Sequence, residues 1–313
     1  MTDGFATGDG MADGALAIGD DGFAEAVMES DGALGEKARG GNGAWIRGEV
    51  AEASAILAAR NLAHADAVAG PAHPKSGTLY LRFGKRALDV ALSGIALLLT
   101  LPVNLVLAVL TYRDVGSPIF YVQERTGKDL KSFKMVKFRN MTEERDEDGE
   151  LLPPEDRITK LGLFVRSHSL DELLNFWSVL KGDMSIIGPR PLPVEFTPHM
   201  TERHKARYAV RPGLECPRVG DEEPEAGIDY AHARFENDVD YVESVSLATD
   251  ACLAFKLVKL VLGRSGSGDS TGTDSHFAGY DSDGRAMSLG RLKDPACYRR
   301  EILGIDDEAG AAE

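Results

Sequence analysis

The chain has 313 residues, of which 50 are Asp or Glu and 35 are Lys or Arg, so its net charge is −15. Residues 1–79 carry a charge of −7, residues 221–313 carry −11, and residues 80–220 carry +3. The acidic ends argue against nucleic acid as the main partner, since a phosphate backbone requires a basic surface. The three cysteines lie 36 and 45 residues apart, which suits neither a zinc site nor a disulfide framework. The composition therefore points away from secreted disulfide-rich, coiled-coil and repeat proteins.

Residues 1–79 are rich in Gly, Ala and Asp, and most of this stretch has no sustained hydrophobic period. Residues 1–40 contain no basic segment followed by an apolar one, so we expect no signal peptide. Residues 51–69 fit either an Ala-rich helix or a weakly ordered lead-in. We interpret residues 1–79 as a low-complexity, mostly disordered extension.

An apolar run at residues 87–110 is the main hydrophobic feature of the chain. At about 1.5 Å per residue its 24 residues reach about 36 Å, enough to cross a bilayer core. Pro102 interrupts the run, and positive charge flanks both of its ends. Because a spanning helix prefers such charge on one side, residues 80–113 are predicted to form a re-entrant membrane helix broken at Pro102.

The alternative for this run is a buried helix in the core of a water-soluble domain. Asp89 and Asn104 lie inside the run and fit either account, although an ionisable group at membrane depth usually has a partner. Lys85 and Arg86 precede Asp89 by four and three residues, so the three side chains share a helical face. This grouping would place Asp89 close to the membrane interface.

Residues 114–263 are predicted to form a small, compact α+β domain resting on the membrane helix. Residues 118–123 and 133–139 have strand patterns, and residues 161–179 have a helical pattern broken around residues 167–169. Residues 202–210 and 247–262 are also predicted to be helical. Residues 264–313 have a Ser/Gly-rich beginning and an acidic end, and we interpret them as a flexible acidic tail.

An acidic pair, Asp171-Glu172, lies in a Ser-x-x-Glu sequence that starts at Ser169. One interpretation is a capping box, in which Ser169 caps the following helix and Glu172 reaches back to it. The chemical interpretation is compatible with this, since anions are favoured at a helix N-terminus. In that case one carboxylate attacks a phosphorus atom and the other holds Mg²⁺.

Several basic residues near Pro/Gly turns complement this acidic pair and suit the binding of diphosphate oxygens. Each of them taken alone is a common surface charge. The candidates are Lys137, Arg139, Arg157, Arg166, Arg190 and Arg211.

The sequence lacks the motifs of several other reaction types. It has no Gly-x-x-x-x-Gly-Lys-Ser/Thr, no Gly-x-Gly-x-x-Gly after a strand, no His-Glu-x-x-His and no Gly-x-Ser-x-Gly. His168 and His204 are expected to be surface or packing residues.

Taken in order, the motifs between residues 82 and 262 resemble those of bacterial sugar transferases, the monotopic phosphoglycosyl transferase or polyprenyl glycosylphosphotransferase family. One of the features that support this resemblance is the apolar run with Pro102. The others are Lys85-Arg86 with Asp89, Gln123-Glu-Arg-Thr-Gly127, Phe133-x-x-x-Lys137-Phe-Arg139-Asn-Met141, Arg157-Ile-Thr-Lys-Leu-Gly162, Arg166-Ser-His-Ser-Leu-Asp-Glu-Leu173, Leu180-Lys-Gly-Asp-Met-Ser-Ile-Ile-Gly-Pro-Arg-Pro191 and Arg211-Pro-Gly213.

This resemblance implies that a sugar 1-phosphate is transferred from a UDP-sugar to polyprenyl (undecaprenyl) phosphate, with release of UMP. It implies that Asp171 is the nucleophile that carries the phosphosugar and that Glu172 is a Mg²⁺ ligand. It also implies a bacterial inner membrane location with the catalytic domain facing the cytoplasm, a role in starting exopolysaccharide, capsule or O-antigen synthesis, and downstream glycosyltransferases as partners. The chain would be a short form, without the N-terminal membrane spans of longer members.

Three departures from the family pattern stand out. Leu174 replaces the usual Pro after Asp-Glu-Leu, and Glu155 replaces the Asp of the usual Asp-Pro-Arg, which reads Glu-Asp-Arg here. The usual Arg-Pro-Gly-Ile-Thr-Gly reads Arg-Pro-Gly-Leu-Glu-Cys, which would place Glu215 near the sugar end of the donor. Two other functions stay open at this point. One is a membrane scaffold that recruits glycan enzymes, and the other is a hydrolase in which water replaces the lipid acceptor.

Overall fold

A computed structural model describes residues 47–304 except 147–148, 150, 153, 221–226 and 264–275. The described residues belong to one compact unit in which helices surround three two-stranded sheets, β1–β2, β3–β4 and β5–β6. This mixture of helix and sheet agrees with the expected α+β class.

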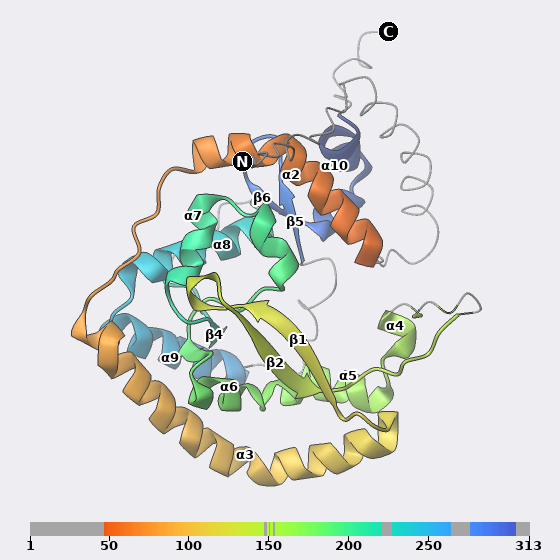
Figure 1. Ribbon diagram of the computed structural model, residues 1–313, viewed down its shortest axis with the longest axis vertical. Helices are drawn as coiled ribbons and strands as arrows, with labels where there is room; N and C mark the ends of the chain where they lie inside the picture. Colours follow the sequence, from red (N-terminus) through yellow and green to blue (C-terminus); the bar gives the residue numbers. More distant parts are fainter. Residues whose placement is uncertain are drawn as a thin grey trace, which may run out of the picture. The chain divides into compact units, whose positions relative to one another are not determined.

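Helix α3, Lys85–Val115, follows a π-helical turn at Tyr80–Gly84 and contains the whole apolar run. Pro102 lies inside the helix, which bends near its middle but stays continuous (Figure 1). The segment Tyr80–Val115 is long and apolar enough to cross a membrane, with a mean hydropathy of 2.2 over its best 18-residue window. Only 17% of that window is buried, so most of its apolar side chains face away from the rest of the protein. A buried core helix would not expose leucines such as Leu98 and Leu99, each 74% exposed.

Strands β1, Phe120–Thr126, and β2, Ser132–Phe138, form an antiparallel hairpin in which Gln123 pairs with Met135. Both predicted strands are confirmed. Phe138 at the end of β2 is buried against Leu107 of α3 and Val165. The hairpin therefore rests on the second half of α3.

Short helices connect the hairpin to the second sheet. They are α4, Pro154–Arg157, α5, Lys160–Ser167, a 3-10 turn at Leu170–Glu172, and α6, Asn175–Lys181. The predicted break around residues 167–169 is confirmed. Ser169 has a φ of 54° and its side chain makes no capping hydrogen bond, so the capping-box interpretation is wrong. The left-handed backbone turns the chain sharply after α5 and sends it into the tight turn that carries the acidic pair.

Strands β3, Ser185–Ile187, and β4, Gly213–Glu215, pair in parallel. A 3-10 segment at Val194–His199, helix α7 at Glu202–Lys205 and a 3-10 turn at Ala206–Ala209 lie between them in the chain. Helices α8, Tyr230–Ser244, and α9, Leu247–Gly263, follow β4. The core between these elements contains Ile187, Val242 and Leu253, and the helical patterns predicted for residues 202–210 and 247–262 are confirmed.

The two flanking stretches fold together. Helix α2, Arg47–Ala69, lies beside strands β5, Phe277–Tyr280, and β6, Ala286–Ser288, with the short helix α10, Pro295–Tyr298, next to them (Figure 1). Leu57 of α2 is fully buried in a cluster with Met287 and Leu289. The expectation of a mostly disordered extension over 1–79 and a flexible tail over 264–313 is therefore wrong for residues 47–69 and 276–304. The expectation also covers residues 1–46, 264–275 and 305–313, which lie outside the described residues.

The expectation of disorder fails for residues 47–69 and 276–304 for a physical reason. Neither α2 nor the β5–β6 hairpin has a core of its own, and each covers the apolar face of the other across more than 200 residues of sequence. A polar contact joins them as well, since Asn61 Nδ2 donates to the carbonyl of Tyr280 at 2.8 Å. The Tyr280 hydroxyl accepts from the amide of Thr201 at 3.0 Å, which ties this layer to α7.

Replacing Leu57 with Ala should lower the free energy of unfolding by roughly 2–5 kcal/mol, because it leaves a cavity at a fully buried position. Denaturant unfolding of the full chain in detergent measures this loss. Leu163→Ala, at a position 58% exposed, is the matched control and should change stability little. Equal effects of the two substitutions would show that α2 does not pack as described.

Candidate active site

The acidic pair occupies the 3-10 turn between α5 and α6. Asp171 is only 5% exposed, although a carboxylate is normally found at the surface. The Nδ2 atom of Asn140, two residues beyond the end of β2, lies 3.4 Å from Oδ2 of Asp171 and donates to it. Burial and the neighbouring Glu172 carboxylate raise the pKa of Asp171, while Lys137 and Arg166 act in the opposite direction.

Cations from three elements face this turn. Burial lowers the pKa of Lys137 on β2, although the carboxylates of Asp171 and Glu172 favour its charged form. Arg166, in the last turn of α5, adds positive charge to the same group. Burial, with a further contribution from Arg190, lowers the pKa of Arg125 on β1 to about 10. The arrangement places two carboxylates among cations in a largely desolvated setting, where charge interactions are strong.

Arg190 reaches the acidic pair from the turn after β3. Its guanidinium contacts Oε1 of Glu172, and its Nη1 atom lies 3.7 Å from Oε2 of Glu215 at the end of β4. The turn is positioned by a close backbone approach, because a Cβ on Gly213 would lie 2.2 Å from the amide nitrogen of Gly188. Only glycine fits at such a distance, so the Gly188 and Gly213 positions place Arg190 next to Glu215.

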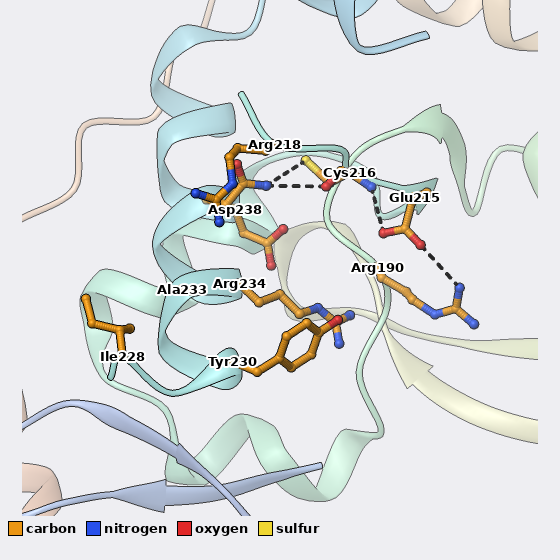
Figure 2. Close-up of a pocket in the computed structure, with 10 residues that line it drawn as sticks. Arg190, Glu215, Cys216, Arg218, Ile228, Tyr230, Ala233, Arg234 and Asp238 are labelled. Atoms are coloured by element: carbon orange, nitrogen blue, oxygen red, sulfur yellow. Dashed lines mark hydrogen bonds and ion pairs between the residues drawn. The ribbon is translucent and has the colours of Figure 1, made fainter. Parts of the chain in front are cut away.

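A pocket of about 400 Å³ opens beside Arg190, between the end of β4 and helix α8 (Figure 2). Figure 2 shows Tyr230 and Arg234 extending from α8 toward the side on which Arg190 and Glu215 lie. The lining residues are Arg190, Glu215, Cys216, Arg218, Ile228, Tyr230, Ala233, Arg234, Asn237 and Asp238. The pocket thus shares Arg190 with the acidic pair and carries charges of both signs.

Comparison with known proteins shows the family to which the chain belongs. A family described as bacterial sugar transferase matches residues 80–264, more than half of the chain. The chain belongs to the bacterial sugar transferase family. This membership makes it an enzyme, of the phosphoglycosyl transferase kind.

Among its relatives, an uncharacterized sugar transferase, EpsL, of Bacillus subtilis is 38% identical over 57% of this chain and 87% of its own. The exopolysaccharide production protein ExoY of Rhizobium meliloti is 33% identical over 58% of this chain and 87% of its own. The UDP-N-acetylgalactosamine-undecaprenyl-phosphate N-acetylgalactosaminephosphotransferase of Aeromonas hydrophila is 32% identical, and the match covers 58% of this chain and 44% of that protein. The chain thus spans less than half of some of the relatives it matches.

In this sugar transferase, the structure brings together only some of the predicted phosphate-binding residues. Lys137, Arg166 and Arg190 lie around Asp171 and Glu172, as described above.

The other three predicted arginines contact backbone carbonyls. Arg139 donates to the carbonyl of Val115 at the end of α3, Arg157 donates to the carbonyl of Leu152 at 2.7 Å, and Arg211 donates to that of Gly182 at 2.8 Å. These contacts fix the framework around the site.

Lys85, Arg86 and Asp89 share a face of α3, as expected, and all three bind the domain that packs against the beginning of this helix. Oδ1 of Asp89 accepts from Ser185 Oγ and from the amide of Ile186, both at 2.9 Å. Asp89 therefore caps the edge of β3 and does not pair with its neighbours on α3.

Those neighbours bind elsewhere in the domain. Lys85 pairs with Asp250 of α9 at 2.6 Å, and Arg86 donates to the last carbonyls of α6 at 2.6 and 2.7 Å. All three side chains therefore clamp the beginning of α3 onto the catalytic domain.

Sequence reasoning missed several residues of the site. Arg125 and Asn140 both lie within motifs quoted for the resemblance, so their spacing from Lys137 on the same hairpin could have identified them. Tyr230 and Arg234 carry no such signal, because they follow β4 by a long segment and reach the site only through the packing of α8.

His204, His232 and Glu236 also cluster, with potential metal-ligand atoms within 4.8 Å of one another. The atoms of this cluster already have protein partners. His204 Nδ1 contacts the Tyr280 hydroxyl and its Nε2 contacts Glu236, both at 2.8 Å, while Glu236 also pairs with Arg203 at 2.6 Å. His204 is buried, so of the two expectations for it packing is confirmed.

Asp171→Asn should raise the free energy of unfolding near pH 7. The pKa of Asp171 is higher in the folded than in the unfolded chain, so its contribution to stability is present at low pH and is lost as pH rises through the folded pKa. The uncharged Asn avoids that loss, and its advantage should shrink toward pH 4. Denaturant unfolding at several pH values measures this trend.

The exposed Asp283→Asn is the matched control for this trend. A destabilised Asp171→Asn protein at pH 7 would contradict the prediction.

Proposed function

We propose that this enzyme transfers a sugar 1-phosphate from a UDP-sugar to polyprenyl phosphate, giving polyprenyl diphosphate-sugar and UMP. The observation that carries the proposal is the buried Asp171-Glu172 pair, surrounded by Lys137, Arg166 and Arg190, in a chain that belongs to the bacterial sugar transferase family. The names of relatives from Aeromonas, Klebsiella and Salmonella support this reaction, since each describes sugar-phosphate transfer to undecaprenyl phosphate.

The proposed route has two displacements at phosphorus. A carboxylate oxygen of Asp171 attacks the sugar-bearing phosphorus of the donor, and the bond from that phosphorus to the UMP oxygen breaks, so that UMP leaves with the electron pair. A phosphate oxygen of the lipid then attacks the same phosphorus and displaces Asp171 as a free carboxylate. Splitting the reaction in this way keeps two bulky anions from having to meet in one step.

The surrounding cations stabilise negative charge on the acidic pair and on the donor. Lys137 and Arg166 favour the ionised form of Asp171, the form that attacks phosphorus, against the burial that raises its pKa. Arg190 and Arg125 stand next to Glu172 and oppose its negative charge as well as that of an incoming diphosphate. Fixed cations aimed at phosphoryl oxygens in a dry site stabilise the charge that builds up during transfer.

The acidic pair also fits a magnesium ion. Mg²⁺ is usually held by one or two carboxylates together with phosphate oxygens of the substrate, and Asp171 and Glu172 supply adjacent carboxylates. We assign Glu172 as the protein ligand, because Asp171 must remain available to attack. When bound, the ion would neutralise charge on the diphosphate.

We also propose that α3 enters the bacterial inner membrane and returns to the same face, with the catalytic domain in the cytoplasm. The beginning of α3 is clamped to β3 and α9, and near its other end Asp114 accepts a hydrogen bond from Thr159 at 2.5 Å. Since both ends are held by one domain, they lie on one side of a bilayer. The exposed apolar middle then brings the site to a phosphate confined to the interface.

The product would begin a surface glycan such as exopolysaccharide, capsule or O-antigen, to be extended by downstream glycosyltransferases. The relative from Rhizobium meliloti is named for exopolysaccharide production, which supports the first of these.

Asp171→Asn should reduce UMP release with undecaprenyl phosphate and the preferred UDP-sugar by at least about 1,000-fold, because the amide cannot act as the nucleophile. The purified full chain is assayed in detergent with Mg²⁺ over a panel of UDP-sugars. Without lipid, the wild-type protein should exchange labelled UMP into the donor and gain the mass of a phosphosugar on the peptide containing Asp171.

Asp283→Asn is the control and should keep full activity. Retained turnover in Asp171→Asn would remove Asp171 as the nucleophile. Net UMP release without lipid would favour a hydrolase, and silence of the folded protein across the panel would favour a scaffold.

Pro102→Leu should straighten α3, because it restores a backbone donor and removes a ring clash that together cost about 3 kcal/mol in a helix interior. In a cysteine-free variant with single cysteines at Thr78→Cys or Ser117→Cys, both positions should react from the cytoplasmic face. Adding Pro102→Leu should move the second position to the opposite face or abolish activity. Val103→Leu is the control, and unchanged labelling with unchanged activity in Pro102→Leu would contradict the re-entrant account.

A further inference from the structure

The pocket beside Arg190 is not used by the displacement proposed above. Its walls come from Arg190, the end of β4 and the first turns of α8 (Figure 2). Arg190 also contacts Glu172 of the acidic pair. At about 400 Å³ it lies within the usual range of pockets that hold small molecules. Because Arg190 borders both the pocket and the acidic pair, a molecule bound at the acidic pair can extend into the pocket.

Arg234 is a charged residue that lines this pocket. The carboxylates of Asp238 and Glu215 act on it electrostatically, but within the described residues Arg234 makes no ion pair or hydrogen bond. Asp238 lies 2.8 Å from Arg207, and Glu215 lies 3.7 Å from Arg190. Burial and the nearby Arg207 lower the pKa of Arg234, so its charged form lacks the compensation that partly buried charges normally have.

The surroundings of Arg234 are held in place. Arg207, only 2% exposed, donates to the carbonyl of Arg190 at 2.7 Å. Asn237 donates through Nδ2 to the carbonyl of Cys216 at 3.3 Å and accepts from the amide of Val219 at 2.8 Å. These contacts fix both walls of the pocket, so an anion entering it would meet a cation without the cost of rearranging the site.

We propose that this pocket is a subsite for the nucleotide-sugar donor in which Arg234 binds an anionic group of that donor. The anion is either a carboxylate on the sugar or an oxygen of the diphosphate, and the same guanidinium chemistry serves both. Glu215, on the facing wall, would accept hydrogen bonds from sugar hydroxyls. This inference rests on the proposed function, because it takes the donor to be a UDP-sugar held at Asp171 and Glu172.

Equilibrium binding to the full chain in detergent, without lipid acceptor, tests the proposal. All variants carry Asp171→Asn to prevent turnover, and the ligands are UDP-glucose, UDP-glucuronate and UDP. UDP-glucose and UDP-glucuronate differ in the sugar carboxylate, and UDP lacks the sugar. Arg234→Gln should weaken binding of at least one ligand by about 10-fold or more, as expected for loss of a hydrogen bond to a charged group. Arg234→Lys should recover part of the loss.

The pattern of losses identifies the source of the anion. A loss for UDP-glucuronate alone assigns the sugar carboxylate, and a donor class of acidic sugars. An equal loss for all three ligands assigns the diphosphate. Arg285→Gln, at an exposed position in the turn between β5 and β6, is the matched control and should bind as the parent does.

Unchanged affinity of a folded Arg234→Gln protein for all three ligands would overturn this inference while leaving the proposed reaction intact. Failure of the parent protein to bind any of the ligands would instead overturn the UDP-sugar reaction and, with it, the subsite.

Discussion

The approach of two backbone segments at Gly188 and Gly213 decides where the charges of this enzyme meet. The amide of Gly213 donates to the carbonyl of Pro189 at 2.9 Å, and there is no room for a side chain at either glycine. Arg190 follows one of these glycines by two residues, and Glu215 follows the other by the same interval. The parallel pairing of β3 with β4 therefore brings a cation and a carboxylate to one edge, next to the turn that holds Glu172.

The same short sheet also holds the apolar helix. Asp89 of α3 accepts hydrogen bonds at the edge of β3, and Lys85 donates to the carbonyl of Ile187 at 2.9 Å. These polar contacts secure the start of a helix whose middle offers almost no polar groups. A helix fixed at both ends to one domain, with exposed leucines between them, suits a surface that is partly lipid and partly water. The β3–β4 sheet therefore supports both the candidate active site and the proposed membrane contact.

Burial is the main cause of the pKa shifts of the charged groups in the site. Asp171 is buried and Lys137 is half-buried, and burial raises the pKa of Asp171 and lowers that of Lys137. Each opposes the shift of the other, because the attraction between the two charges favours both charged forms. A buried carboxylate is poorly hydrated, which suits the role of nucleophile proposed above for Asp171. Arg234 extends the same pattern into the neighbouring pocket, where it makes no ion pair or hydrogen bond with the residues that the structure describes.

Local sequence determined much of this protein. The apolar run with Pro102, the strand alternation before Arg139, the break after Arg166 and the adjacent Asp171-Glu172 are all short-range patterns, and the structure has a helix, two strands, a turn and an acidic site at these positions. Short-range patterns succeed because a helix or a hairpin is decided largely by neighbours in the chain. The ordered motifs also sufficed to indicate the family.

Tertiary structure decided the rest. Only packing over more than 200 residues of sequence joins α2 to the β5–β6 hairpin, and neither stretch has a local signal of burial. The capping role expected of Ser169 fails because the domain forces that residue into a left-handed turn. Arg139, Arg157 and Arg211 looked like Arg190 in sequence, but only the folded chain shows that Arg190 contacts the acidic pair while the other three bind backbone carbonyls elsewhere. The reason is physical: an arginine side chain is long and always charged, so its partner is decided by what lies within reach after folding.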